Sequence, residues 1–178
     1  MSNPLRYPVL LFALLAGSAQ AQQPQTVPYV DLGRYAGKWH EIARLPNKFQ
    51  EQCVANVTAE YTVRDDSQID VINRCTKRDG SIEAAHGRVR VADHVTNAKL
   101  GVRFAPDWLS WLPMVWAKYW ILDLAPDYSV VAVGDPRRTY LWILSRTPQL
   151  PDTAYDEVVN RMTAQGYDTA KLVKTKQE

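Results

Sequence analysis

The chain has 178 residues, with 21 Lys and Arg against 19 Asp and Glu, and 46% of its residues are hydrophobic. This length suits one domain that is large enough to bury a core. The near-neutral charge gives no electrostatic basis for binding nucleic acid, which depends on neutralising phosphates with basic side chains.

Residues 1–21 have the pattern of a secretory signal peptide. Arg6 precedes a short apolar run, residues 9–16, and residues 19–21 (Ala-Gln-Ala) form a small-x-small cleavage site. The run is shorter than the roughly 20 residues that span a bilayer, which favours cleavage over a retained membrane anchor. No Cys lies near the cleavage site, so no bacterial lipid anchor is expected. We therefore expect an exported, soluble protein, either periplasmic or secreted.

Residues 22–29, with several Gln and Pro, predict a disordered leader, and residues 30–178 predict a single domain. Eight segments of strand-like composition are separated by turn signals: 37–45, 54–63, 68–75, 81–91, 98–104, 117–124, 128–133 and 139–145. Most connections are too short for parallel crossovers, so the strands should form an antiparallel meander. Closure into a barrel removes both sheet edges. A β-sandwich is the competing architecture, although the longer Greek-key connections typical of it are not evident.

One amphipathic helix is predicted near the C-terminus. It begins near Pro151 and Asp152 and ends before Gly166. Its apolar side chains recur at helical spacing: Tyr155, Val158, Val159 and Met162. Segments 119–122 and 141–144 are apolar on both faces, so we expect the barrel interior on one side of them and this helix on the other. A final extended segment, 167–174, should return along the barrel.

Three motifs in this order resemble the signatures of the lipocalins. Gly37-Lys38-Trp39 opens the first strand, Asp127-Tyr128 lies in a late turn, and Arg146 ends the last strand. The sequences around the first and third motifs are similar to the bacterial and apolipoprotein D-like branch. The resemblance runs from about Val30 to the C-terminus. It implies an all-β fold, an eight-stranded antiparallel up-and-down β-barrel (the lipocalin calyx) with one C-terminal α-helix packed outside.

The resemblance and the barrel pattern together predict a carrier. An eight-stranded barrel has an interior that is filled by side chains or holds one small ligand. We expect it to bind a fatty acid or lysophospholipid for transport or storage, with a role in envelope lipid maintenance. Two alternatives stay open: a lipid-modifying or isomerase-type enzyme on the same barrel, and a structural envelope protein with a filled barrel. His40, His86 and His94 have no metal-ligand spacing, so no metal is expected. The sequence after residue 21 also lacks the Gly-x-Ser-x-Gly, His-Glu-x-x-His and Gly-x-x-x-x-Gly-Lys motifs, so we expect neither catalysis nor a cofactor.

The signature residues are interpreted as structural. A small barrel must be closed at one end to keep water out of a ligand site. The Arg146 guanidinium can stack on the Trp39 ring by a cation–π contact and can donate hydrogen bonds to free carbonyls. Gly37, Asp127 and Tyr128 belong to the same signature set.

The candidate ligand contacts are Glu41, Asn56, Trp120, Tyr140 and Trp142. Strand alternation points Glu41 into the barrel, where it is a satisfied polar group, a ligand contact or, least favoured, a general base. The three aromatic residues are expected to line the cavity, although packing within the barrel or under the helix would also suit them. Asn56 shares a face with Thr58 and is a candidate inward polar contact.

Segment 107–116 is too apolar for an ordinary surface loop. It contains Trp108, Trp111 and Trp116 together with Leu and Met side chains. Exposed apolar patches usually mark binding surfaces. Peripheral contact with a lipid surface, a homodimer contact, folding over the cavity mouth and packing on the barrel itself are the four interpretations.

Cys53 and Cys75 are predicted to form a disulfide. The turn near Asp65 places Cys75 opposite about residues 56–58, which is too far from Cys53 for a bridge if both strands are straight. The segment before Val54 looks like a loop that can curl back, and export favours pairing. Two free thiols and pairing between molecules are the alternatives.

Overall fold

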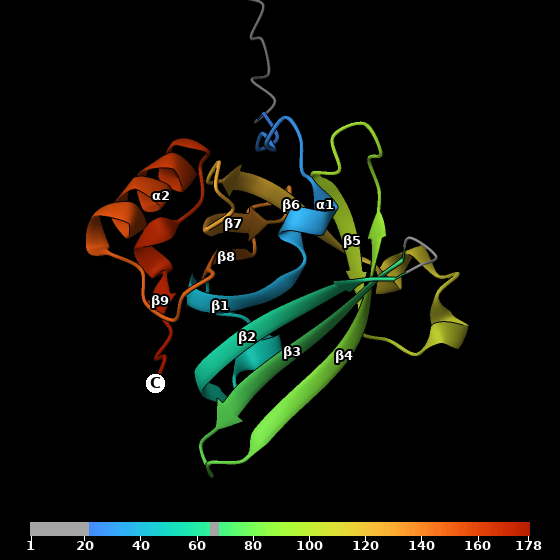
Figure 1. Ribbon diagram of the computed structural model, residues 1–178, viewed down its shortest axis with the longest axis horizontal. Helices are drawn as coiled ribbons and strands as arrows, with labels where there is room; N and C mark the ends of the chain where they lie inside the picture. Colours follow the sequence, from blue (N-terminus) through green and yellow to red (C-terminus); the bar gives the residue numbers. More distant parts are fainter. Residues whose placement is uncertain (1–21, 65–67) are drawn as a thin grey trace, which may run out of the picture.

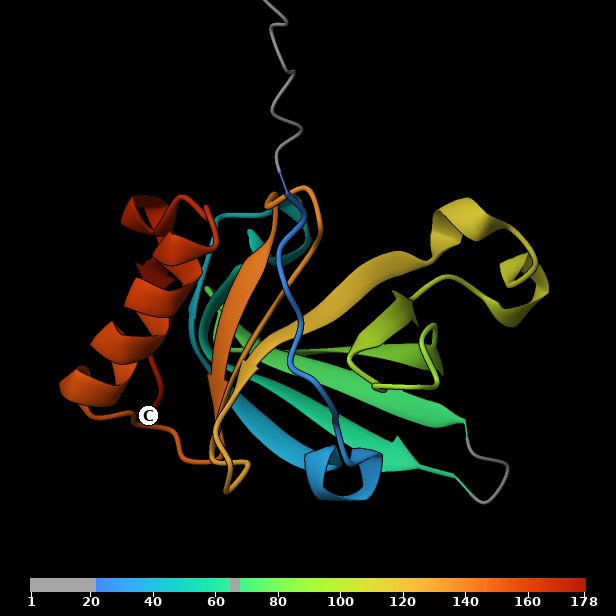
Figure 2. The same cartoon turned by 90° about the horizontal axis from the view of Figure 1, so that it is seen from above.

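Eight strands form a closed antiparallel barrel in the computed structural model, which describes residues 22–64 and 68–178. Each strand pairs with the next along the chain, and β1 pairs with both β2 and β8 (Figures 1 and 2). The strands are β1 (Gly37–Arg44), β2 (Cys53–Val63), β3 (Ile69–Lys77), β4 (Ile82–Val91), β5 (Lys99–Arg103), β6 (Ala117–Leu124), β7 (Val130–Gly134) and β8 (Leu141–Ser145). The predicted fold is confirmed. The signal-peptide prediction for residues 1–21 lies outside the described residues, as does the turn at 65–67.

The helices and the last strand lie around this barrel. They are α1 (Leu32–Tyr35), α2 (Asp152–Ala164), β9 (Val173–Lys174) and the 3-10 turns η1 (Lys48–Gln50), η2 (Asp107–Leu109), η3 (Pro113–Val115) and η4 (Thr169–Lys171). Gly166, at φ +85°, follows α2 as predicted. The segment 167–174 is only partly extended, since η4 precedes β9.

The alternating strand directions give the barrel two distinct ends. The connections 45–52, 78–81, 104–116 and 135–140 lie at one end, here called the open end. Helix α1 and the connections 92–98 and 125–129 lie at the other, here called the closed end. Figure 2 shows α1 at the bottom and the 104–116 and 135–140 connections toward the top.

Two apolar clusters lie on opposite faces of the late strands. The inner cluster fills the closed half of the barrel and includes Trp39, Val71, Leu100, Val131 and Leu144. The outer cluster lies beneath α2 and includes Leu122, Leu141, Ile143, Val158 and Met162. Because neighbouring residues of a strand face opposite sides, β8 contributes Leu144 to the inner cluster and Ile143 to the outer one. This arrangement places the helix outside the barrel, as predicted (Figure 1).

Residues 22–29 differ from the expected disordered leader, because they lie along the barrel wall. The Val27 N–H donates to the Ile121 carbonyl oxygen, and the Gln25 N–H donates to the Gln165 side chain. Arg138 also donates to the Gln22 carbonyl oxygen. Gln and Pro form no helix or strand of their own here, but their extended backbone still offers hydrogen-bonding groups to neighbouring elements.

The predicted disulfide between Cys53 and Cys75 is present, with a Cα–Cα distance of 5.5 Å. The hairpin register is the predicted one near its turn, where Glu60 pairs with Ile72. Strand β2 then takes up an extra residue on each side of Ala55, so that Cys53 pairs with Lys77. These two β-bulges, rather than a curling loop, bring Cys53 within reach of Cys75.

Candidate functional site

The closed end of the barrel is sealed by Arg146 and Trp39. The Arg146 guanidinium lies 3.8 Å from the centre of the Trp39 ring, within cation–π range. Its N–H groups donate to five backbone carbonyls, those of Arg34, Tyr35, Ala36, Lys38 and Tyr128. The predicted stacking and carbonyl contacts are both present. Arg146 therefore ties α1, the start of β1 and the β6–β7 turn together.

The other signature residues shape the backbone around this seal. Gly37 has φ +94°, and a Cβ there would lie 3.3 Å from Arg146 Nη1, so glycine allows the guanidinium to approach. The Asp127 carboxylate accepts hydrogen bonds from the backbone and hydroxyl of Ser129. The Tyr128 hydroxyl accepts the Asp31 N–H, which joins the β6–β7 turn to the start of α1.

Three tyrosines form a hydrogen-bonded group above the seal, here called the floor cluster: Tyr35, Tyr61 and Tyr119. The Tyr119 hydroxyl lies 2.8 Å from that of Tyr35 and 2.9 Å from that of Tyr61. Burial raises the pKa of Tyr61 to about 12, and it also raises the pKa values of Tyr35 and Tyr119. The cluster is therefore neutral near pH 7 and offers phenol hydroxyls within an apolar interior.

A polar group around Glu41 lies nearer the open end, and it is here called the mouth network. The buried Glu41 carboxylate accepts hydrogen bonds from Arg44 and Gln50, both at 2.7 Å, and from the Thr175 hydroxyl. Both carboxylate oxygens are thus bonded by protein groups, which agrees with the interpretation of Glu41 as a satisfied polar residue. Ile42 is an extra residue in the β1–β8 register, and this bulge lets Glu41 and Arg44 meet despite their spacing of three.

Aromatic side chains stand beside the mouth network. The Trp142 indole N–H donates to the Gln50 side-chain oxygen at 2.8 Å. The Tyr140 ring stacks against Trp142 with centroids 5.8 Å apart, and it also contacts Phe49 at 5.7 Å. The structure therefore brings Tyr140 and Trp142 together at the open end, where segment 45–52 lies against them.

Several inward-facing side chains at and beyond the level of the floor cluster keep accessible surface. Ala59, Asn73 and Tyr119 share a strand face with inner-cluster residues, yet each keeps accessible surface. Ala85 and Ala117 face inward by the same alternation and are exposed. Strand β5 pairs only with the last residues of β4, Arg88 to Val91.

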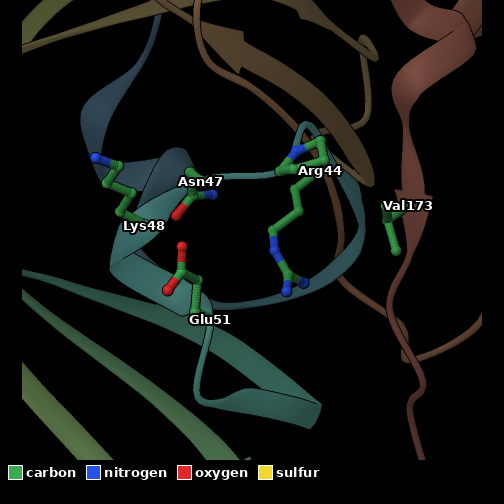
Figure 3. A pocket seen from close by; sticks show the side chains of 6 residues that line it. Arg44, Asn47, Lys48, Glu51 and Val173 are labelled. Carbon is green, nitrogen blue, oxygen red and sulfur yellow. The ribbon is translucent and has the colours of Figure 1, made fainter.

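A separate cavity of about 280 Å³ lies outside this interior, between segment 45–52 and β9. Figure 3 shows Arg44, Asn47 and Glu51 pointing toward the space that the segment encloses, with Val173 across from them. Lys48, which is exposed, adds a second cationic group to its wall. This cavity adjoins the mouth network through Arg44.

Two of the predicted ligand contacts, Trp120 and Asn56, do not face the barrel interior. Trp120 belongs to the outer cluster beneath α2, so the prediction that it lines the interior is wrong; its neighbours Tyr119 and Ile121 take the inward positions. Asn56 is also not an inward contact. It has φ 53° in the β2 bulge, which turns its side chain to Thr76 and to the Glu178 N–H.

Arg44, Gln50 and Thr175 were missed by sequence reasoning. Regular alternation would put the side chains of Arg44 and Glu41 on opposite faces of β1. The bulge at Ile42 shifts the alternation by one residue, so that both side chains lie on the same face. Thr175 comes from the C-terminal segment, which lies between β1 and β2: its N–H donates to the Ile42 carbonyl, while the Asn56 N–H donates to the Lys176 carbonyl. Local sequence patterns describe neighbouring residues, so they give no indication of this contact between distant segments.

Within residues 22–64 and 68–178, no group of three or more His, Cys, Asp or Glu side chains is arranged to hold a metal ion. In the same part of the chain, no helix combines the length and the apolar character needed to cross a membrane.

Comparison with known proteins identifies the family. A model of the lipocalin-like domain matches residues 30–177. The chain belongs to the lipocalin family. It is 38% identical to temperature-induced lipocalin-1 of Arabidopsis thaliana over 160 residues, which cover 89% of this chain and 85% of the relative. It is 35% identical to the outer membrane lipoprotein Blc of Escherichia coli K12, covering 80% and 77% of the two chains.

An animal relative and the solved structures agree with this assignment. Apolipoprotein D of Macaca fascicularis is 30% identical, covering 96% of this chain and 94% of the relative. Insecticyanin from the tobacco hornworm Manduca sexta superposes with a TM-score of 0.67 at 22% identity, covering 88% and 85% of the two chains. At that identity the likeness concerns the fold, and it places this lipocalin among barrels of the same architecture.

Proposed function

We propose that this lipocalin binds one single-chain lipid, a fatty acid or a lysophospholipid, inside the barrel and transports or stores it without catalysis. The observation that carries the proposal is the contrast between the two halves of the interior. The closed half is packed and sealed by Arg146 over Trp39. The open half is lined by inward-facing side chains that keep accessible surface, such as Ala85 and Ala117.

Chain burial supplies the binding energy in this proposal. Each methylene group moved from water into an apolar interior contributes about 0.8 kcal/mol, so an acyl chain needs few specific bonds. The polar end then lies at the open end. There, Arg44 and Lys48 supply cationic groups for a carboxylate or phosphate, and Trp142 supplies an indole N–H. Envelope lipid maintenance is the biological role that we propose for an exported carrier of this kind.

Tryptophan emission tests this proposal, because two tryptophans make a matched pair. Trp142 stands at the open end beside Gln50, whereas Trp120 lies in the outer cluster beneath α2. Titration with fatty acids of increasing chain length should give a saturable change in wild type and in Trp120→Phe, and a much smaller change in Trp142→Phe. A wild type without any saturable change across the series would contradict the proposal.

Segment 107–116 is proposed to contact a lipid surface. Trp108, Trp111 and Met114 are 74%, 75% and 86% exposed at the open end. The segment is anchored, because Arg103 donates to the carbonyls of residues 105 and 106, and Trp116 donates to the Ser110 carbonyl. Tryptophan side chains favour the membrane–water interface.

Sedimentation with vesicles of mixed neutral and anionic phospholipid tests this contact. Wild type should co-sediment, and a Trp108→Ser/Trp111→Ser variant should lose most of the binding. A protein that stays in the supernatant and dimerises through these residues would instead support the homodimer interpretation.

We also propose export without a lipid anchor. Cys53 and Cys75, the only cysteines in the sequence, are joined to each other. This proposal differs from the names of the bacterial relatives, which are outer membrane lipoproteins. The mass of the protein recovered from its natural host distinguishes them: cleavage after Ala21 without added acyl chains is expected, and an acylated N-terminus would contradict the proposal.

A further inference from the structure

The floor cluster contains one more hydroxyl hydrogen than its internal bonds use. Three phenols provide three donor hydrogens, whereas Tyr35, Tyr61 and Tyr119 are joined by two hydrogen bonds. In one of them the Tyr61 hydroxyl donates to Tyr119. The remaining hydrogen therefore belongs either to Tyr35 or to Tyr119, depending on which of these two donates to the other.

Burial decides between the two arrangements. Tyr35 is 2% exposed, and a hydrogen that was left unpaired there would bear the full desolvation cost of a buried donor. Tyr119 keeps accessible surface on the inward face of β6. A phenol oxygen accepts two hydrogen bonds through its two lone pairs. The lower-energy arrangement has Tyr119 accepting from both neighbours and keeping its own O–H for the barrel interior.

A second polar group lies one level nearer the open end. Asn73 faces inward on β3, paired with Ala59 on one side and Ala85 on the other. Its side-chain oxygen is buried and has no hydrogen-bond partner among the described residues. The next inward pair toward the floor is Val71 with Tyr61, a member of the floor cluster. The Tyr119 hydroxyl hydrogen and the Asn73 oxygen are therefore two polar groups in an apolar interior that lack a partner among the described residues. A ligand with a polar atom near them suits this interior better than a plain hydrocarbon chain.

We propose that the preferred ligand carries an oxygen function, a hydroxyl or carbonyl, on the part of its chain that reaches the floor cluster, where it accepts the Tyr119 hydroxyl hydrogen. The ligand class is thus an oxygenated single-chain lipid, such as a hydroxy or oxo fatty acid. This inference rests on the proposed function, since it places the ligand's polar head at the open end and this second oxygen at the floor.

Paired ligands test the inference. Affinities are measured for saturated fatty acids of 10 to about 18 carbons and for the same acids with a terminal hydroxyl. At the chain length that reaches the floor, we expect the hydroxy acid to bind wild type about fivefold more tightly, as one neutral hydrogen bond allows. In Tyr119→Phe the preference should vanish or reverse, because the hydroxyl loses its donor, while the plain acid binds at least as well as before.

Tyr35→Phe is the matched control within the cluster. It removes a hydroxyl that bonds the same oxygen but leaves the Tyr119 hydrogen in place, so the preference for the hydroxy acid should persist. Circular dichroism serves as the control that Tyr119→Phe and Tyr35→Phe are both folded. Binding of plain acids with no preference at any chain length would overturn this inference and leave the proposed function intact. Failure of both ligand series to bind would instead contradict the proposed function. A preference that survives Tyr119→Phe would also overturn the inference.

Discussion

Removing the Arg146 guanidinium should destabilise the whole barrel rather than only its ligand site. In Arg146→Ala, five backbone carbonyls at the closed end lose their donor, and the Trp39 ring loses its cationic cover. These carbonyls belong to α1, β1 and the β6–β7 turn, and the Arg146 guanidinium binds all three at one point.

The size of the loss follows from the geometry. The cation–π contact contributes about 1 kcal/mol at a partly exposed site. The carbonyl bonds add about 2 kcal/mol, less than their full charged value, because three of them share Nη2 and solvent reaches the guanidinium. The free energy of unfolding should therefore fall by about 3 kcal/mol. In a domain of this size that lowers the midpoint temperature by about 6–12 °C.

Urea unfolding followed by far-ultraviolet circular dichroism measures this change. Arg90→Ala is a matched control, because the exposed Arg90 also stacks on a tryptophan, Trp116 at 4.3 Å. Within the described residues the Arg90 side chain donates to no backbone carbonyl, and its loss should cost under about 1 kcal/mol. An Arg146→Ala variant within about 0.5 kcal/mol of wild type would refute the assignment of Arg146 as the closing residue.

Three further predictions concern stability. The Cys53→Ser/Cys75→Ser variant should lose about 3 kcal/mol of unfolding free energy, because the bridge closes a loop with a sequence separation of 22; an unchanged urea midpoint would contradict this. Met162→Ala should cost about 2–5 kcal/mol through the cavity left beneath α2, and a loss under about 1 kcal/mol would show that the outer cluster does not hold the helix. Burial raises the Tyr61 pKa to about 12, so the folded state keeps a proton that the unfolded state releases above about pH 10. The protonated Tyr61 hydroxyl should therefore contribute fully to stability below pH 10, and this contribution should decline toward pH 12. Urea unfolding across this range should show a shallower decline in the free energy of unfolding for Tyr61→Phe than for wild type.

The architecture was predictable because its signals are local. Turn residues such as Gly80 and alternating strands such as 99–103 fix the elements, and the late strands are apolar on both faces because α2 covers their outer side. The contact of Trp39 with Arg146 could likewise be expected, because Trp39 lies near the start of β1 and Arg146 directly follows β8, so both lie at the closed end.

The details of the site were not predictable because they depend on bulges and distant segments. Alternation alone gives no way to place Trp120 outside and Tyr119 inside, since the strand is apolar on both faces. The bulge at Asn56 turns that side chain away from the interior, and the bulge at Ile42 brings Arg44 to Glu41. Thr175 reaches the mouth network from more than 130 residues away in the sequence.

Native mass spectrometry of the protein with a single-chain lipid tests the central claim most directly, when it is combined with a variant that fills the interior. Ala59 faces inward beside Trp39 and keeps accessible surface, whereas the next residue, Glu60, faces outward and pairs with Arg74. Wild type and Glu60→Phe should each carry one lipid of unchanged mass per chain, and Ala59→Phe should carry none while remaining folded. A wild type that retains no lipid, or an Ala59→Phe variant that binds as well as wild type, would contradict binding in the barrel, and conversion of the lipid to a new mass would indicate an enzyme instead.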